Sequence, residues 1–204
     1  MLENEYKWLL TKDVYDILFE YINEALIVEN EQTHINYYYD TDVQSFRKQN
    51  TTVRMRYCNG ELTGTLKKHS DQPNSVEKAW IQSELPCYIY IEWKKLFMQG
   101  EMVTHRTSFG LGKGITLSFD ENTYLGKTDY EVELEFDFEN STLAKQWKNS
   151  LSTFLENLNI LNSGIVACGE SKSKSERFFI EKDKFTNRRM DYFDDAGEYR
   201  DNYY

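Results

Sequence analysis

Residues 131–136 read Glu-Val-Glu-Leu-Glu-Phe, a strict alternation of carboxylates with apolar side chains. Successive side chains of a β-strand point to opposite faces, so Glu131, Glu133 and Glu135 share one face of a strand. Like charges about 7 Å apart repel each other unless a cation compensates them. The stretch therefore predicts a strand with one acidic face that needs cations elsewhere in the fold.

Other predicted strands also collect their charged residues on one face. A half-buried antiparallel sheet whose polar face meets water explains this alternation by itself. Carboxylates and cations separate by strand, however, and two predicted helices with apolar stripes need an apolar sheet surface to cover. These two observations favour a closed barrel with a polar lumen and helices outside. The further charged residues that share a face are Glu3, Glu5 and Lys7 in the first strand, Arg54 and Arg56 in another, and Lys67 in a third.

The alternation and spacing of apolar residues predict the order of elements along the chain. Asn59-Gly60 predicts a tight hairpin between its two flanking strands, and Glu121-Asn122 and Leu125-Gly126 predict turns. Asp13 is the predicted N-cap of the first helix, and the segment 176–204 is left as a terminal helix or a tail. Strands are expected at 3–10, 32–40, 51–57, 62–68, 76–84, 102–111, 114–120 and 129–138, and helices at 13–26, 87–99 and 141–158.

Composition restricts the class of protein. The 204 residues suffice for one sizeable core, and the net charge of −10 argues against a protein that wraps nucleic acid or docks on anionic lipid. Three cysteines without a CxxC spacing indicate free thiols in a reducing compartment. The amino terminus lacks the apolar core of a secretory signal, so a cytoplasmic location is expected.

Several short motifs, in a fixed order, resemble one known family. This set of motifs is similar to that of the CYTH superfamily, also called triphosphate tunnel metalloenzymes. The resemblance implies an α+β fold, with an eight-stranded antiparallel β-barrel as its tunnel, over residues 1–180, and leaves 181–204 as a C-terminal helix or tail. The motifs are ExExK at 3–7, Tyr-Tyr-Asp-Thr at 38–41, Val-Arg-Met-Arg at 53–56, Thr-Leu-Lys at 65–67, the acidic strand at 130–135 and Ser-Lys-Ser-Glu-Arg-Phe at 173–178.

The resemblance also implies roles for individual residues. Lys174 would give way to Lys172 or Arg177 under a shifted alignment, and Asp40 is equally suited to fixing a turn with Thr41 or to a functional role. Lys7, Arg56 and Lys67 are implied as catalytic residues. The implied metal ligands are Glu3, Glu5, Glu77, Asp120, Glu131, Glu133 and Glu135, and the implied triphosphate-binding residues are Lys7, Arg54, Arg56, Lys67, Arg106 and Lys174.

The implied activity is metal-dependent hydrolysis of a triphosphate with Mg²⁺ or Mn²⁺, releasing orthophosphate. The substrate is left open among tripolyphosphate, thiamine triphosphate and a nucleoside triphosphate. Two alternatives are an adenylyl cyclase that makes cyclic AMP and pyrophosphate, and a polyphosphate- or nucleotide-binding module without turnover. The expected partner is the small triphosphate, with no nucleic acid and no membrane, and a homodimer is left open.

Overall fold

The computed structural model describes residues 2–69, 74–112, 114–159 and 172–192, apart from the side chains of residues 2, 3, 74–77, 159 and 187–192. The chain forms two compact units, Met1–Ser171 and Lys172–Tyr204. Helix α3 (Lys174–Tyr192) belongs to the second unit. The predicted division after residue 180 stays a prediction. No helix among the described residues is both long and apolar enough to cross a membrane.

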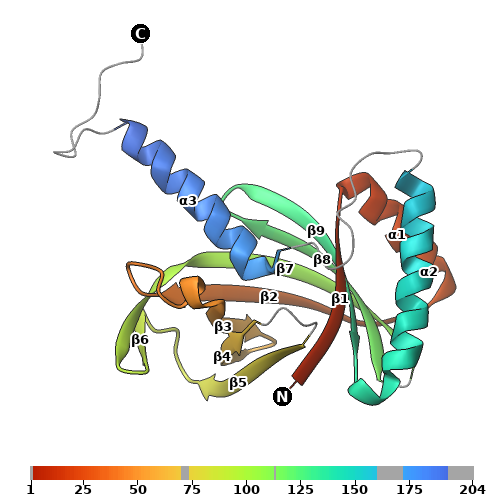
Figure 1. Cartoon of the computed structure of the whole chain (residues 1–204), viewed down its shortest axis with the longest axis horizontal. Helices are drawn as coiled ribbons and strands as arrows, with labels where there is room; N and C mark the ends of the chain where they lie inside the picture. Colours follow the sequence, from red (N-terminus) through yellow and green to blue (C-terminus); the bar gives the residue numbers. More distant parts are fainter. Residues whose placement is uncertain (1, 70–73, 113, 160–171, 193–204) are drawn as a thin grey trace, which may run out of the picture. The chain divides into compact units, whose positions relative to one another are not determined.

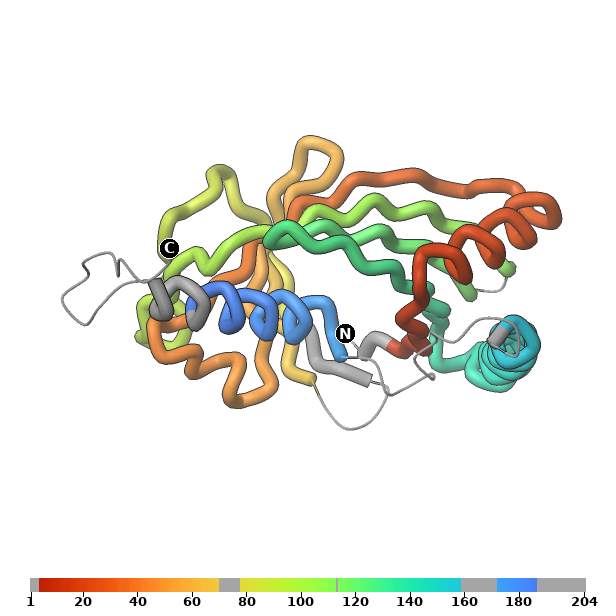
Figure 2. Tube along the Cα trace, turned by 90° about the horizontal axis from the view of Figure 1, so that it is seen from above, coloured from red at the N-terminus to blue at the C-terminus, as the bar shows by residue number. Residues whose placement is uncertain are grey.

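The first unit is built on one antiparallel sheet with the order β2-β3-β4-β5-β1-β9-β8-β7-β6. Strands β2 and β7 also pair with each other, with Gln32 opposite Arg106, so they run side by side in Figure 2. This pairing gives each of eight strands a neighbour on both sides, and β6 extends the ring as a hairpin partner of β7. The strands are β1 (Leu2–Leu10), β2 (Val28–Asp40), β3 (Thr51–Cys58), β4 (Glu61–Lys68), β5 (Asn74–Gln82), β6 (Tyr88–Ile91), β7 (Lys94–Gly112), β8 (Ile115–Tyr124) and β9 (Lys127–Phe136).

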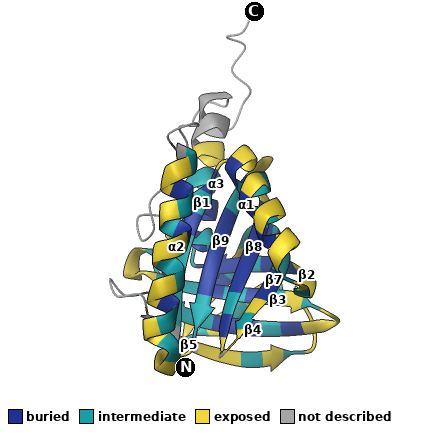
Figure 3. Ribbon diagram, turned by 90° about the vertical axis from the view of Figure 1, so that its right-hand side faces the viewer, coloured by how far each residue is buried: buried dark blue, intermediate teal, exposed yellow. Residues whose placement is uncertain are grey.

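Two helices, α1 (Lys12–Ala25) and α2 (Ser141–Asn159), cover the outer face of β1, β8 and β9 (Figures 1 and 3). Val14, Leu18 and Ile22 recur every four residues in α1, so all three face the sheet and are buried. They pack in one core with residues such as Trp8 and Leu134 of the strands. The outer face of these strands is therefore apolar, which leaves the opposite face to the charged residues.

The predicted helix at 87–99 is wrong, because this segment forms β6, a turn and the start of β7. Glu92 and Trp93 adopt positive φ values of 48° and 63°, as the tight turn of a hairpin requires. Gly100, predicted to end that helix, has φ 143° beside an irregularity in the β2–β7 register. Leu96 is fully buried in a second core with residues of β2, β3 and β4, and this packing decides between the two periodicities.

Two smaller predictions are also wrong, whereas the hairpin at 59–60 is confirmed. Helix α1 begins at Lys12 with Thr11 as its N-cap, so Asp13 lies in the first turn. Residues 121–122 continue strand β8, and the chain turns at Leu125-Gly126, where both φ values are positive. Asn59 and Gly60 likewise have positive φ between β3 and β4. Cys58 and Cys87 are free thiols, and Cys168 lies outside the described residues.

Candidate functional site

The strand register places the charged residues of β1, β8 and β9 on one common face. Glu133 lies opposite Lys7, and Glu131 lies opposite Asp120. Residues directly opposite each other in a sheet point to the same side. Because the helices cover the other side, these residues point to the inner face of the ring of strands, which we call the lumen.

The innermost part of the lumen holds a cluster of three carboxylates, Asp120, Glu131 and Glu133. All three are buried, at 0%, 0% and 5% exposure. One carboxylate oxygen from each lies within 4.8 Å of the others. Burial of ionised carboxylates is costly unless cations compensate them. The cluster therefore needs positive charge at close range.

Two basic side chains supply positive charge to this acidic cluster. Arg106 of β7 donates from Nε and Nη2 to both oxygens of Asp120 at 2.7 Å, and it also pairs with Glu133. Its Nη1 lies 2.8 Å from Glu135. The Nζ of Lys7 lies 3.5 Å from Glu133 and 3.9 Å from Glu131. A metal cation would thus compete with Arg106 and Lys7 for the carboxylates. A phosphate group would compete with the carboxylates for these two basic side chains.

Burial and charge shift two pKa values at the edge of the cluster in the same direction for different reasons. Burial raises the pKa of the Glu135 carboxyl, although Arg106 acts to lower it. Burial also acts to lower the pKa of the Arg106 guanidinium, but Glu133 and Asp120 outweigh it and raise that pKa well above the ordinary value. The carboxylates therefore favour the protonated, charged form of Arg106.

A separate group of cations lies on β3 and β4. Arg54 donates to Thr65 at 3.1 Å, and Arg56 donates to the amide oxygen of Asn36 at 2.8 Å. Among the described residues, no carboxylate lies within ion-pair distance of either arginine. Lys67 reaches Glu5 at 4.0 Å and so lies between the two groups. This side of the lumen offers positive charge to an anion.

The Arg56 guanidinium is disfavoured in its charged form by burial and by the nearby arginines. Burial, followed by the neighbouring charges of Arg54 and Arg106, lowers the pKa of Arg56 to about 10. The group is still protonated at neutral pH, so a positive charge that no carboxylate of the described residues balances stays in a desolvated place. An anionic ligand would relieve both the burial and the mutual repulsion of the arginines.

Asp40 holds a loop together. Its buried carboxylate accepts backbone N–H bonds from Thr41 at 2.7 Å, Phe46 at 3.0 Å and Arg47 at 2.9 Å. These bonds satisfy amides of the loop between β2 and β3. The geometry supports the structural alternative for Asp40, which is to fix the turn with Thr41.

Not every predicted metal ligand or phosphate contact belongs to the acidic cluster. Glu5 contacts Lys7 at 2.7 Å and lies opposite Glu135, so it borders the cluster without being one of its three carboxylates. The side chains of Glu3 and Glu77 lie outside the described residues, although their backbones pair in β1 and β5. Lys174 begins α3 in the second unit. The roles of Glu3, Glu77 and Lys174 stay predictions.

His34 is buried in the lumen, at 5% exposure, and none of the sequence motifs singled it out. Its Nε2 contacts Gln32 at 2.9 Å, and its Nδ1 has no hydrogen-bond partner among the described residues. Burial, together with the nearby charges of Arg56 and Arg106, lowers the pKa of His34 to about 3. Only the alternation along β2 could have indicated that position 34 faces inward.

We expect this histidine to make the protein less stable in acid. The unfolded chain takes up a proton on His34 near pH 6.5 while the native state does not, so stability is lost as pH falls from about 6.5 toward 3. Between pH 7 and 5, His34→Gln should lose about 2 kcal/mol less unfolding free energy than the original chain. Urea unfolding at both pH values measures this difference, and equal losses would contradict the assignment.

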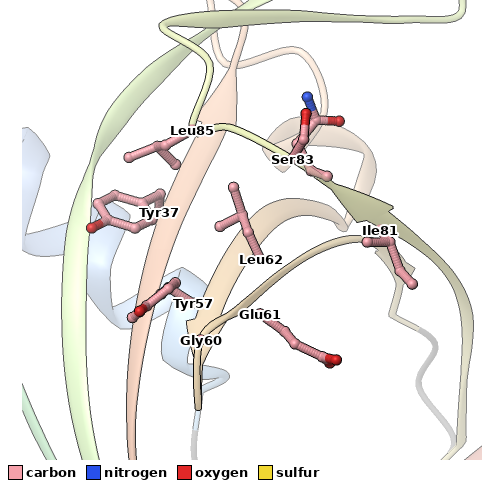
Figure 4. Close-up of a pocket in the computed structure, with 9 residues that line it drawn as sticks. Tyr37, Tyr57, Gly60, Glu61, Leu62, Ile81, Ser83 and Leu85 are labelled. Carbon is pink, nitrogen blue, oxygen red and sulfur yellow. The ribbon is translucent and has the colours of Figure 1, made fainter.

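A pocket of about 440 Å³ lies beside the β3–β4 hairpin, at a different place from the charged cluster (Figure 4). Tyr37, Tyr57 and Leu62 project toward it from three adjacent strands, and Leu85 closes it from the segment after β5. Its lining includes the carboxylate of Glu61 and no cationic side chain. This pocket is therefore a poor site for a chain of phosphates.

Comparisons with known proteins agree with this architecture. The family described as the CYTH domain matches residues 1–164. YjbK of Bacillus subtilis, named as a candidate triphosphatase, is 27% identical over 201 residues, covering 90% of this chain and 97% of that protein. The fold resembles the crystal structure of a candidate adenylate cyclase from Bacillus halodurans, with TM-score 0.61, 24% identity and coverage of 87% and 97%. It also resembles HpAC1 from Hippeastrum, a candidate adenylyl cyclase described as having a dominant triphosphatase activity, with TM-score 0.63, 16% identity and coverage of 87% and 95%.

Proposed function

This chain belongs to the CYTH family, and we propose that it hydrolyses the terminal phosphoanhydride bond of a small triphosphate inside the lumen. One observation carries the proposal. A buried cluster of three carboxylates faces the same lumen as two arginines that have no carboxylate partner among the described residues. A divalent cation and a polyphosphate together would satisfy both charge requirements.

The donor set of the acidic cluster fits Mg²⁺ or Mn²⁺. Asp120, Glu131 and Glu133 offer only oxygen ligands, which hard divalent cations prefer, and the oxygens lie close enough to share one ion. When bound, the cation would neutralise phosphate charge and polarise a phosphoryl oxygen. Glu5 and Glu135 border the cluster and are proposed as further ligands, together with Glu3 and Glu77.

The basic residues would bind and orient the phosphate chain. Arg54 and Arg56 present guanidinium groups that suit bidentate contacts with phosphate oxygens, and Lys67 adds a compact charge beside them. Because charge accumulates on the moving oxygens during phosphoryl transfer, fixed cations at these positions stabilise the transition state. Lys7 and Arg106 are proposed to join them, and Lys174 is proposed as a further contact. A water molecule attacks the terminal phosphorus, the bond from that phosphorus to the bridging oxygen breaks, the rest of the substrate departs as the diphosphate part, and the attacked group is released as orthophosphate.

Hydrolysis is preferred to cyclisation because hydrolysis needs only the charged lumen. A cyclase also needs a pocket that holds a purine with its 3′-hydroxyl at the α-phosphorus. The names of YjbK and HpAC1 point toward triphosphatase activity in relatives. A cytoplasmic location and a homodimer remain predictions of the sequence, and the partner proposed here is the small triphosphate.

Product analysis tests the proposal directly. The purified chain would be given tripolyphosphate, thiamine triphosphate or ATP, each with Mg²⁺, Mn²⁺ or a chelator, and orthophosphate would be separated from pyrophosphate. We expect metal-dependent release of orthophosphate. Glu133→Gln, which removes one charge of the cluster, serves as the inactive control. Pyrophosphate with cyclic AMP, or binding without any product, would overturn the hydrolase assignment.

A further inference from the structure

A line of polar side chains runs along the inner wall of the lumen, from Arg56 on β3 to the β8–β9 hairpin. Four buried members from four further strands, Asn36, Thr104, Asn122 and Asp129, are here called the polar relay. The hydrogen bonds run from Arg56 Nε to Asn36 Oδ1 (2.8 Å), from Asn36 Nδ2 to Thr104 Oγ1 (3.5 Å), from Thr104 Oγ1 to Asn122 Oδ1 (2.7 Å) and from Asn122 Nδ2 to Asp129 Oδ1 (3.0 Å).

The direction of these bonds is the same at every step. Each group accepts from the side of Arg56 and donates toward Asp129, whose second oxygen accepts from the hydroxyl of Tyr124 at 2.7 Å. A donor at one end and a carboxyl at the other thus fix the orientation of both amides and the hydroxyl between them.

Because the relay is buried, losing any of its hydrogen bonds would cost free energy of folding. Asn36 and Thr104 are 1% exposed, Asn122 is 0% exposed and Asp129 is 8% exposed. Buried polar groups that lose a partner cost free energy that apolar residues of similar size would not cost. The hydrogen bonds described above connect the relay to the proposed site through Arg56, so the orientation of Arg56 is a property that the relay can serve.

The lumen contains an internal comparison. Arg106 is held at Nε and Nη2 by the carboxylate of Asp120, with Glu133 and Glu135 also in contact, so its charge is balanced within the protein. Arg56 is held at Nε by the neutral amide of Asn36. An amide oxygen fixes the guanidinium without neutralising it, and this leaves the two Nη nitrogens charged for a ligand.

We propose that Asn36 and the polar relay are positioning elements that hold Arg56 in one orientation and present its Nη nitrogens to a phosphate group. The inference rests on the proposed function, since it names the substrate contact that the relay serves. It assigns a role to uncharged residues that carry none of the family motifs quoted above. Asn36 acts through Arg56 and touches no reacting atom.

Two substitutions separate this role from a purely structural one. Asn36→Asp keeps the size and the acceptor but adds a charge, so Arg56 should become balanced as Arg106 is, and affinity for tripolyphosphate should fall about tenfold or more. Thr104→Val removes only the hydroxyl in the middle of the relay and should weaken binding severalfold. Thr104→Ser restores the hydroxyl and should bind as the original chain does.

Ser108→Ala is the matched control. Ser108 is also buried on β7, and its hydroxyl pairs with Ser118 at 3.0 Å outside the relay, so its loss removes a comparable bond. Calorimetric titration with tripolyphosphate in the presence of Mg²⁺ measures the affinities, and circular dichroism checks that each variant folds. Equal affinities of Asn36→Asp and the original chain, or equal losses in Thr104→Val and Ser108→Ala, would overturn the inference.

A readout independent of binding distinguishes this inference from the proposed function. The Nε–H resonance of Arg56 in a ¹⁵N nuclear magnetic resonance spectrum reports its bond to Asn36. We expect it to shift in Thr104→Val and to keep its position in Thr104→Ser and Ser108→Ala. If the original chain binds no tripolyphosphate, the proposed function fails, whereas an unmoved Arg56 resonance in Thr104→Val overturns the relay itself.

Discussion

Replacing Arg56 by alanine should lower kcat/KM for triphosphate hydrolysis by about a hundredfold or more. Burial with neighbouring arginines lowers the pKa of this side chain to about 10. Removing one preorganised donor to developing charge typically costs a factor of about 10²–10³ in rate. The loss should appear in kcat as well as in KM, because the contact strengthens as charge moves.

The control for this experiment is another arginine of the same unit. Arg47 lies in the loop after β2 and donates to Gln44 at 2.6 Å, so Arg47→Ala should retain the original rate. Arg56→Lys keeps the charge but loses the planar fork, and it should fall between the two. Steady-state rates with tripolyphosphate supply the comparison. Near-normal turnover in Arg56→Ala would remove the basic side of the lumen from the mechanism.

Replacing Arg106 by glutamine should destabilise the metal-free protein by about 3–5 kcal/mol. This side chain is the cation shared by Asp120, Glu133 and Glu135, so its loss removes positive charge from buried carboxylates. Removal of one partner from a buried ion pair typically costs that amount. A divalent cation can replace the missing charge, so Mg²⁺ or Mn²⁺ should recover much of the loss by binding to the native state.

Urea unfolding with chelator and with Mn²⁺ measures both parts of this expectation. The exposed pair of Lys12 and Asp16, at 2.6 Å on helix α1, supplies the control. Loss of such a surface pair costs at most about 1 kcal/mol, so Lys12→Ala should unfold almost as the original chain does in both conditions. If Mn²⁺ stabilises Arg106→Gln no more than it stabilises the original chain, the arginine and the cation do not share the carboxylates.

The parts of this fold that depend on local pattern could be predicted from the sequence. The alternation at 131–136 placed three carboxylates on one face, and Asn59-Gly60 fixed a hairpin, because both signals act between neighbours in the chain. The segment 87–99 has apolar residues that satisfy helical and strand spacing equally. Whether this segment forms a helix or strands depends on the burial of Leu96 in a core that residues of distant strands complete. The local pattern alone could therefore not predict its secondary structure.

The residues of the candidate site likewise include some that the sequence could indicate and others that it could not. Charged residues such as Glu133 and Arg56 could be found because charge on a strand is conspicuous and because they match family motifs. Asn36, Thr104 and Asn122 could not, since an uncharged polar residue on a strand resembles a solvated one until its partners across the sheet are known. The pairing of Arg106 with Asp120 likewise depends on the register between β7 and β8, which no single strand encodes.

The order of strands also has a consequence for how the chain acquires this site. Strand β1 is synthesised first, yet it pairs with β9, with Leu10 opposite Tyr130 and Asn4 opposite Phe136. Such pairings give a high contact order, and proteins of this kind fold on the order of milliseconds to seconds. A ribosome must therefore release almost the whole sheet before Lys7 can meet Glu133. The acidic side of the lumen is therefore completed last, after the strands that carry Arg54 and Arg56 have been synthesised.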